Sequence, residues 1–442
     1  MVKLLNFINQ RWFISLLGLI GLSLLIWFVG PLFAFAGYEP LEPENHRLNL
    51  ITFITFVWLA VRIWSYFKAK RQNNEVLAAM VANPQTTFTP DQQASQDDLQ
   101  RLQEGIQQAI ETLKKAHLGG RFGQQFLYQL PWYIIIGPPG TGKTTLLQTS
   151  DLKFPLSNNG KDAFRGVGGV GGTRNCNWWF ADEAVLLDTA GRYTSQDSHE
   201  KVDQTAWLGF LDLLKKYRPR RPINGAIIAI SIKDLLEQDK AKQQEEAIKI
   251  RKRIQELHEK FNMRFPVYVL LTKCDLLAGF TEYFDEIDRD KRNQVWGMTF
   301  KLDEKNTANT IDQFTAEFEL LEQCLQNQLL DKLEHERGRE RRNYIYTFPQ
   351  QFSSLRDLIY PFLKEIFQSS RWEHTIMLRG IYFTSATQEG SPIDRIMGSL
   401  ANSFGLDHQT LATVNNQGKS FFINQMVCFF QIGNMNCYNV AL

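Results

Sequence analysis

The sequence contains little cysteine and no large excess of charge of either sign. Its 442 residues include five cysteines, and these form neither a CxxC pair nor a Cys/His cluster with metal-ligand spacing. A disulfide-stapled scaffold or a zinc site is therefore not expected, and a reducing compartment suits most of the chain. The 49 lysines and arginines nearly balance the 47 aspartates and glutamates, so we expect no nucleic-acid partner. The length suggests two or three domains.

Long apolar runs are confined to the region near the amino terminus. Residues Trp12–Ala36 are almost entirely apolar, and Leu48–Phe67 form a second, weaker run. About 20 such residues suffice to cross a bilayer. The loop between the runs, "GYEPLEPENHR", is acidic, whereas lysines and arginines flank the outer ends, which predicts that both ends are cytoplasmic. We therefore expect a two-helix transmembrane hairpin over residues 1–71 that contacts membrane lipid.

Two alternatives to this hairpin stay open. Ala34-Phe35-Ala36 fits a signal-peptide cleavage site, although the apolar run exceeds the usual length of about 7–15 residues and a second run follows closely. The runs could also be two buried core helices. The hairpin is favoured because both runs are long enough to span.

A polar linker and an amphipathic helix are predicted for residues 72–130. After the polar stretch, apolar residues recur at spacings of three and four, which predicts a helix. These positions are Leu99, Leu102, Ile106, Ile110 and Leu113. The polar face carries mixed charge and not a basic surface, so we expect the apolar stripe to pack on the following domain and not on lipid.

Residues 137–144, "GPPGTGKT", match the phosphate-binding loop pattern in full. An apolar segment that predicts a strand, Tyr133–Ile136, precedes the loop, and the helix-compatible "TTLLQ" follows it, which is the setting this motif requires. Lys143 would reach the β- and γ-phosphates, and the Thr144 hydroxyl would ligate Mg²⁺. The predicted phosphate-loop contacts are Gly137, Pro138, Pro139, Gly140, Thr141, Gly142, Lys143, Thr144 and Thr145.

A second motif, Asp188-x-x-Gly191, ends the apolar stretch of "EAVLLDTAGRY". An aspartate at the end of a neighbouring parallel strand can hold the Mg²⁺ shell, and the Gly191 N–H could contact a γ-phosphate. The glycine-rich segment upstream carries Thr173, which either completes the Mg²⁺ coordination, as in the first switch of a GTPase, or belongs to a plain loop entering a strand. The predicted metal ligands are Thr144, Thr173 and Asp188, and the predicted catalytic residues are Lys143, Thr144 and Asp188.

Base recognition is predicted at Thr272-Lys273-Cys274-Asp275, which resembles the GTPase motif [NT]-K-x-D. An aspartate there accepts hydrogen bonds from guanine N1–H and the 2-amino group, which adenine does not offer. Lys273 would pack along the base, and Ser385 and Ala386 follow a later strand as the last base-contact loop does. The alternative is a strand that simply ends in a polar turn. The motif order predicts an α/β fold, a P-loop GTPase-like domain with a parallel sheet, and GTP or ATP with Mg²⁺ as cofactors.

Arg192 follows the second motif where Ras-like enzymes have a water-positioning glutamine. Fast intrinsic hydrolysis is therefore not expected. The guanidinium could stabilise transition-state charge or pair with carboxylates, and pairing is favoured because arginines in polar loops usually do so.

The remaining segments complete the expected domain layout. Helical periodicity and a dense charge run, without strong strand patterns, predict a helical insertion over residues 280–374. The P-loop NTPase-like domain then consists of residues 131–279 and a last strand and helix at 375–412. Residues 413–442 form an atypical tail.

Several long phrases resemble the IcmF/TssM family of inner-membrane components of bacterial type VI secretion systems. They are "PWYIIIGPPGTGKTTLL", "GTRNCNWWFADEAVLLDTAGRYTSQDS", "RRPINGAIIAIS", "NQVWGMTF" and "LRGIYFTSATQEGSPIDR". The resemblance extends from the hairpin to about Gly418. It implies an oligomeric scaffold in the bacterial inner membrane, with its NTPase-like domain in the cytoplasm.

The resemblance also implies partners. They are a TssL/DotU-like inner-membrane protein, baseplate components and, only if the periplasmic region is present, a TssJ-like outer-membrane lipoprotein. Family members usually continue through a third membrane span, whereas the tail here departs from that pattern, so we expect a truncated or frameshifted product. The phosphate loop is not universal in the family, and the resemblance does not distinguish guanine from adenine as the bound base.

Three functional hypotheses follow. In the first, the chain is a secretion-complex scaffold whose nucleotide state changes the shape of the cytoplasmic domain. In the second, it is an active NTPase that energises assembly. In the third, it is a membrane-tethered regulatory GTPase unrelated to secretion.

Overall fold

The chain divides into two compact units, Met1–Thr86 and Thr87–Leu442. The computed structural model describes residues 21–29, 43–60, 90–115, 128, 130–150, 176–181, 183–195, 200–300, 307–368, 375–386 and 420–423. Each unit is described by itself below.

The first unit contains helices at residues 21–29 and 44–60. The Arg47 guanidinium joins them, since it donates a hydrogen bond to the Trp27 carbonyl at 3.2 Å. Among the described residues, no helix is both long and apolar enough to cross a membrane. Much of each predicted span lies outside the described residues, so the transmembrane hairpin stays a prediction.

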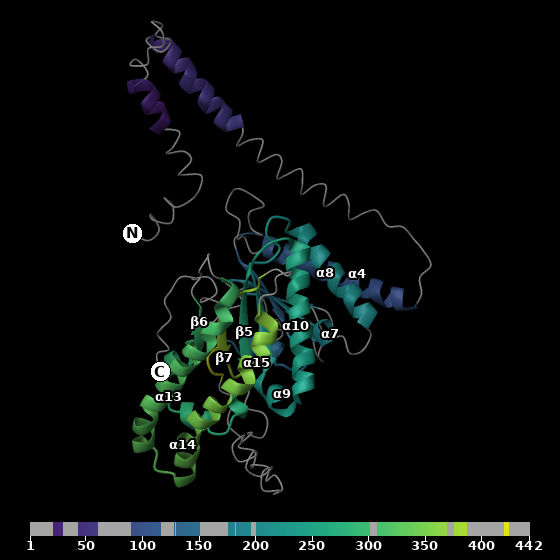
Figure 1. The fold of residues 1–442 in the computed structure, drawn as a ribbon. Coiled ribbons are helices and arrows are strands. Elements are labelled where there is room, and N and C mark those ends of the chain that lie inside the picture. Colours follow the sequence, from purple (N-terminus) through teal and green to yellow (C-terminus); the bar gives the residue numbers. More distant parts are fainter. Residues whose placement is uncertain are drawn as a thin grey trace. The chain divides into compact units, whose positions relative to one another are not determined.

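The second unit is built on seven strands and a set of helices (Figure 1). In chain order the strands are β1 (Trp132–Ile136), β2 (Cys176–Phe180), β3 (Val185–Thr189), β4 (Gly225–Ser231), β5 (Pro266–Thr272), β6 (Gly297–Thr299) and β7 (Met377–Phe383). The α-helices are α4 (Pro90–Lys115), α6 (Lys143–Thr149), α7 (Arg192–Ser195), α8 (Glu200–Tyr217), α9 (Ile232–Glu237), α10 (Lys240–Phe261), α11 (Phe280–Phe284), α12 (Arg289–Arg292), α13 (Phe314–His335), α14 (Arg339–Ser354) and α15 (Arg356–Phe367). Two 3₁₀ helices are η3 (Cys274–Leu276) and η4 (Thr307–Gln313).

The strands form one mixed sheet in the order β2-β3-β1-β4-β5-β7-β6. The inner strands β3, β1, β4, β5 and β7 are parallel to one another. The edge strands differ, because β2 runs antiparallel to β3 and β6 runs antiparallel to β7. The α/β class and the mainly parallel sheet agree with the sequence expectation, and the two antiparallel edge strands were not predicted.

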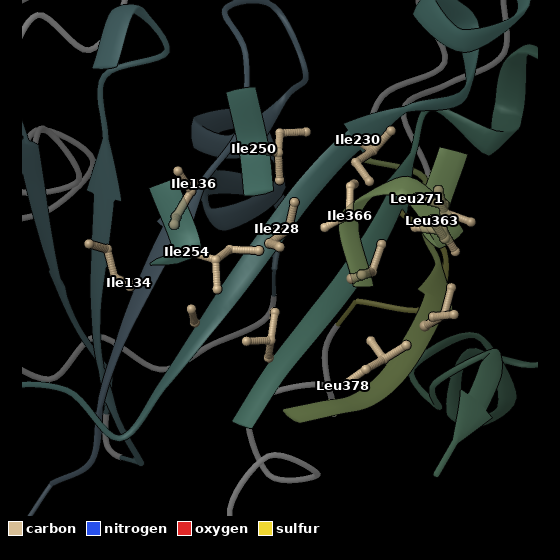
Figure 2. Packing of buried hydrophobic residues seen from close by; sticks show 14 of the residues in the cluster. Ile134, Ile136, Ile228, Ile230, Ile250, Ile254, Leu271, Leu363, Ile366 and Leu378 are labelled. Carbon is tan, nitrogen blue, oxygen red and sulfur yellow. The ribbon is translucent and has the colours of Figure 1, made fainter. Parts of the chain in front are cut away.

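One face of the sheet carries most of the core. Alternate residues such as Ile134, Ile136 and Ile228 point toward this face, where Ile254 of α10 and Ile366 of α15 lie over them (Figure 2). All five are at most 1% exposed. Strands buried in this way read as continuous apolar runs, which is why β1, β4 and β5 were recognisable in the sequence.

Helix α4 packs into the same core. Leu102, Ile106 and Ala109 on one side of α4 are at most 3% exposed, and α4 lies along α8 (Figure 1). The expectation that this amphipathic helix packs on the following domain is therefore confirmed.

The segment 280–374 contains helices α11 to α15, together with the short strand β6. Strand β6 was not expected. Its three residues are too few to show an alternating pattern, and the pairing of Met298 with Ile381 of β7 is a long-range contact. Figure 1 shows α13 and α14 side by side at one end of this unit.

Candidate functional site

The predicted motifs meet at one edge of the sheet. Parallel strands β1, β3, β5 and β7 end at Ile136, Thr189, Thr272 and Phe383, and the carboxyl ends of parallel strands lie at the same edge. The residues that follow each strand are the phosphate-loop motif, Ala190–Gly191, the base-recognition motif and the Ser385 loop. Hydrogen bonds join these loops to one another, so the predicted residues lie close together.

The phosphate-loop motif has the backbone that its glycines allow. Gly140 and Gly142 have φ angles of 77° and 82°, a left-handed conformation that side chains with a Cβ rarely adopt. Helix α6 then begins at Lys143. The glycines therefore turn the chain from β1 into α6, which is the geometry that points backbone N–H groups into a concave loop.

Lys143 lies inside this loop. Its ammonium group donates to the carbonyls of Gly137 and Pro138 at 2.6 and 2.8 Å. The residue is 7% exposed, and burial lowers the pKa of Lys143 to about 8, with the Asp188 charge opposing the shift. The lysine is therefore mainly protonated at neutral pH, and it is positioned as a cation within the loop.

Thr144 and Asp188 form the expected hydroxyl–carboxylate pair. The Thr144 Oγ1 donates to Asp188 Oδ2 at 2.7 Å, which joins α6 to the end of β3. Oxygens of this kind are the ligands that Mg²⁺ prefers, usually with water and phosphate oxygens in the remaining positions. Among the described residues, no group of three or more His, Cys, Asp or Glu side chains could hold a metal ion. The Thr144 and Asp188 oxygens fit a Mg²⁺ that would take its remaining ligands from water and phosphate. Thr173, the third predicted ligand, lies outside the described residues.

Gly191 lies directly against the phosphate loop. A Cβ at this position would come within 2.4 Å of the Pro139 backbone nitrogen, so any other residue would push the two loops apart. The loop is held from the same side by Thr194, whose hydroxyl accepts a hydrogen bond from the Gly137 amide at 3.3 Å. Thr194 was not predicted, and no motif in the sequence marks it.

The base-recognition motif is joined to the phosphate loop through Thr272. Its hydroxyl donates to the Thr141 carbonyl at 2.7 Å. Lys273 then adopts a left-handed φ of 60°, which turns the chain sharply after β5. Thr272 therefore fixes the distance between the two parts of the candidate site.

Asp275 and Ser385 contact each other at the other end of the site. The Ser385 hydroxyl donates to Asp275 Oδ1 at 2.6 Å. Burial raises the pKa of Asp275 to about 6, although the Ser385 hydrogen bond and the charge of Lys273 oppose the shift. The carboxylate is thus oriented by a neighbouring loop. Ala386, the last predicted contact, is half-buried against the cluster that includes Tyr382 and Ile423.

Arg192 is paired with carboxylates, as the favoured interpretation of the sequence predicted. It contacts Asp98 of α4 at 2.8 Å and Asp203 of α8 at 3.0 Å. The Asp203 side chain is 1% exposed. The pairing links the residue after Gly191 to helix α4. Neither aspartate was predicted, because Asp98 is 94 residues from Arg192 and Asp203 lies 11 residues away on a different helix.

Comparison with known proteins gives two matches in sequence. Residues 200–430 match the family of the IcmF-related N-terminal domain. The chain is 54% identical over 335 residues to a protein of Pseudomonas aeruginosa described as "Type VI secretion system component TssM1". That alignment covers 75% of this chain and 30% of the relative, so the chain spans less than a third of the relative's length.

Solved structures show weaker similarity. The signal recognition particle receptor SRb-GTP/SRX complex from Chaetomium thermophilum has a TM-score of 0.22 and 19% identity, covering 33% of this chain and 71% of that one. A mutation variant of SsGBP has a TM-score of 0.19 and 11% identity, covering 38% and 47%. The fold is defined by the strand order and the strand registers.

Replacing Arg192 by alanine should destabilise the second unit and loosen α4. Hydrogen bonds to charged groups contribute about 1.5–3 kcal/mol each, and Arg192 makes two of them. Its side chain is 30% exposed, and solvent weakens such pairs, so we expect the free energy of unfolding to fall by about 2 kcal/mol in total. Amide hydrogen exchange in α4 should also become faster, because Asp98 loses its contact with the α7 residue. Urea denaturation and hydrogen-exchange mass spectrometry measure the two effects.

The matched control is Arg356→Ala. Arg356 pairs with Glu319 and Glu322. Its side chain is about as exposed as that of Arg192, but Glu319 is 52% exposed whereas Asp203 is 1% exposed, and exposed pairs contribute about 0.2–1 kcal/mol. Equal effects of the two substitutions on α4 exchange would contradict the role given to Arg192.

Proposed function

Since the chain belongs to the IcmF/TssM family, we propose that it is part of an inner-membrane scaffold subunit of a type VI secretion complex, with a cytoplasmic GTPase-like domain that acts as a conformational switch. The family match and the TssM1 relative support the secretion role. The four motifs meet at one edge of the sheet, which supports nucleotide binding. The proposed switch role depends on this observation.

The residues at this edge divide between the two ends of a nucleotide. Lys143, the loop amides and the Gly191 amide bind the phosphates, and the adjacent Thr144 and Asp188 oxygens hold Mg²⁺. Asp275, oriented by Ser385, accepts hydrogen bonds from the base. The nucleotide, when bound, supplies the γ-phosphate whose presence or absence sets the state of the site.

Guanine is favoured over adenine for a physical reason. The buried Asp275 carboxylate accepts one hydrogen bond from Ser385 at Oδ1 and has further lone pairs to offer. Guanine presents N1–H and the 2-amino group to such an acceptor, whereas adenine offers neither donor in that arrangement. We therefore propose GTP with Mg²⁺ as the preferred ligand.

The presence of Arg192 in place of a water-positioning glutamine favours slow hydrolysis, as in a switch, over the fast hydrolysis of a motor. Arg192 stands where a glutamine would orient the attacking water, and its guanidinium is engaged by Asp98 and Asp203. Movement of Gly191 on γ-phosphate binding would move Arg192 and therefore α4, which follows the linker. Steady-state turnover well above slow intrinsic GTPase rates, lost in Lys143→Ala, would favour the active NTPase instead.

Membrane attachment is supported by the first unit. Phe28, Phe53 and Phe56 on its two helices are 70%, 65% and 68% exposed, and large exposed apolar surface marks contact with lipid or protein. We propose that this unit belongs to a multi-pass segment in the inner membrane. The proposed partners are a TssL/DotU-like protein, baseplate components and other copies of the chain, with a TssJ-like lipoprotein only where the periplasmic region is present.

Lys143→Ala should weaken binding of GTP and ATP at least tenfold, because a charge-assisted hydrogen bond to phosphate contributes about 1.5–3 kcal/mol. Asp275→Ala should instead remove the preference for GTP over ATP. Equilibrium binding of fluorescent nucleotides measures both. The control is Lys242→Ala, at an exposed position of α10, which should change neither affinity. Equal binding of the two nucleotides to the wild type, unaltered by Asp275→Ala, would show that the guanine assignment is wrong.

GTP binding should also weaken as pH falls through about 6, the pKa of Asp275. Protonation removes the acceptor, so the affinity should drop about tenfold between pH 7 and pH 5. Binding of magnesium tripolyphosphate is the control, since this ligand shares the phosphate titration and lacks a base. Parallel pH profiles for the two ligands would argue against ionised Asp275 as the base contact.

Membership of the complex is tested in bacterial membranes. The chain should remain in the membrane fraction after a high-salt wash, and it should co-purify in detergent with the TssL-like protein of the same secretion system. Recovery in the soluble fraction, without the TssL-like protein, would contradict the scaffold role and favour the unrelated regulatory GTPase.

A further inference from the structure

Residues 420–423 are part of the core of the second unit, although no motif in the sequence places them near the candidate site. Phe421, Phe422 and Ile423 are 0%, 2% and 2% exposed. The family match over residues 200–430 includes them. Their position beside the base-recognition loops suggests a role beyond filling the core.

Phe421 pairs with Ser385 through the main chain in both directions. The Phe421 amide donates to the Ser385 carbonyl at 2.8 Å, and the Ser385 amide donates to the Phe421 carbonyl at 3.1 Å. This antiparallel bridge extends β7 by one further pairing at the point where the strand ends. The backbone of Ser385 is thereby fixed by a segment more than thirty residues away along the chain.

The segment itself is anchored on its far side. The Phe422 amide donates to the Arg292 carbonyl at 2.7 Å. The Phe421 ring lies 5.5 Å from the Phe280 ring, and the Phe422 ring lies 5.4 Å from the Trp296 ring. Edge-to-face and tilted aromatic pairs at these distances are favourable. Packing in this aromatic cluster therefore stabilises the segment that pairs with Ser385.

Ser385, held in this way, in turn positions the base-recognition residue Asp275. Its hydroxyl donates to Asp275 Oδ1 at 2.6 Å, and the neighbouring Thr384 carbonyl accepts from the Cys274 amide at 3.2 Å. Two hydrogen bonds to one base edge require that the carboxylate be held within about 0.5 Å and 10–20° of the productive geometry. The connection runs from Phe421 through Ser385 to Asp275.

We propose that residues 420–423 complete the base-binding half of the site, and that Phe421 is a positioning residue for guanine specificity. The inference rests on the proposed nucleotide function. Phe421 acts through its backbone, because the hydrogen bonds that hold Ser385 are main-chain bonds. The two main-chain hydrogen bonds of Phe421 go to Ser385 of the base loop, so a change at Phe421 should affect selectivity for the base and leave phosphate binding unchanged.

The test compares Phe421→Pro with Phe421→Leu in the full chain. Both substitutions remove the aromatic ring, and only proline removes the amide that donates to Ser385. Binding of GTP, ATP and magnesium tripolyphosphate is measured for each. We expect the ratio of GTP to ATP affinity to be at least tenfold lower in the proline variant than in the leucine variant, with equal tripolyphosphate affinity. Equal ratios in the two variants would overturn the proposal.

A measurement on the wild type keeps the proposal testable if the proline variant does not fold. Hydrogen exchange is followed with GTP or with magnesium tripolyphosphate bound. GTP should slow exchange in peptides that cover 383–386 and 420–423, whereas tripolyphosphate should not. Protection of 272–275 by GTP without protection of 420–423 would refute the positioning role.

The result also separates this inference from the proposed function. If the wild type binds ATP as tightly as GTP, the guanine assignment itself is wrong, and the positioning role falls with it. If the wild type prefers GTP and the proline variant keeps that preference, the proposed guanine-nucleotide site is retained and only the role of Phe421 is overturned.

Discussion

The hydrogen bond between Thr144 and Asp188 joins the first helix after the phosphate loop to the strand next to β1. It can form because β1 and β3 are parallel neighbours, with Ile135 opposite Asp188. The same parallel arrangement of β4, β5 and β7 brings the Thr272 and Ser385 loops to the same edge of the sheet. Each contact in the candidate site thus depends on a common strand direction, since an antiparallel inner strand would carry its motif to the opposite edge.

The two ends of the site are tied to two different parts of the chain. At the phosphate end, Arg192 joins the loop after β3 to Asp98 of α4, the helix that follows the linker. At the base end, the Ser385 loop pairs with Phe421. Each end of the site is therefore in direct contact with a segment outside the sheet.

Much of the local structure could be predicted from the sequence. The buried strands β1, β4 and β5 are continuous apolar runs, and the glycines of the phosphate loop carry the positive φ angles that their position implies. The amphipathic stripe of α4 predicted its packing because the period of the pattern identifies the buried face. Strand β6 and the antiparallel edges could not be predicted, because three-residue strands and edge strands owe their pairing to neighbours far along the chain.

The candidate site, like the fold, could be predicted only in part from the sequence. The sequence by itself determined the residue types and their local settings: a phosphate loop between a strand and a helix, an aspartate at the end of another strand, and a TKCD motif after a third. Only the tertiary structure decided which of these residues touch, that Arg192 pairs with Asp98 and Asp203, and that Phe421 supports Ser385. The physical reason is that motifs record short-range backbone chemistry, whereas these pairings join residues that the fold brings together from distant positions and that no local pattern marks.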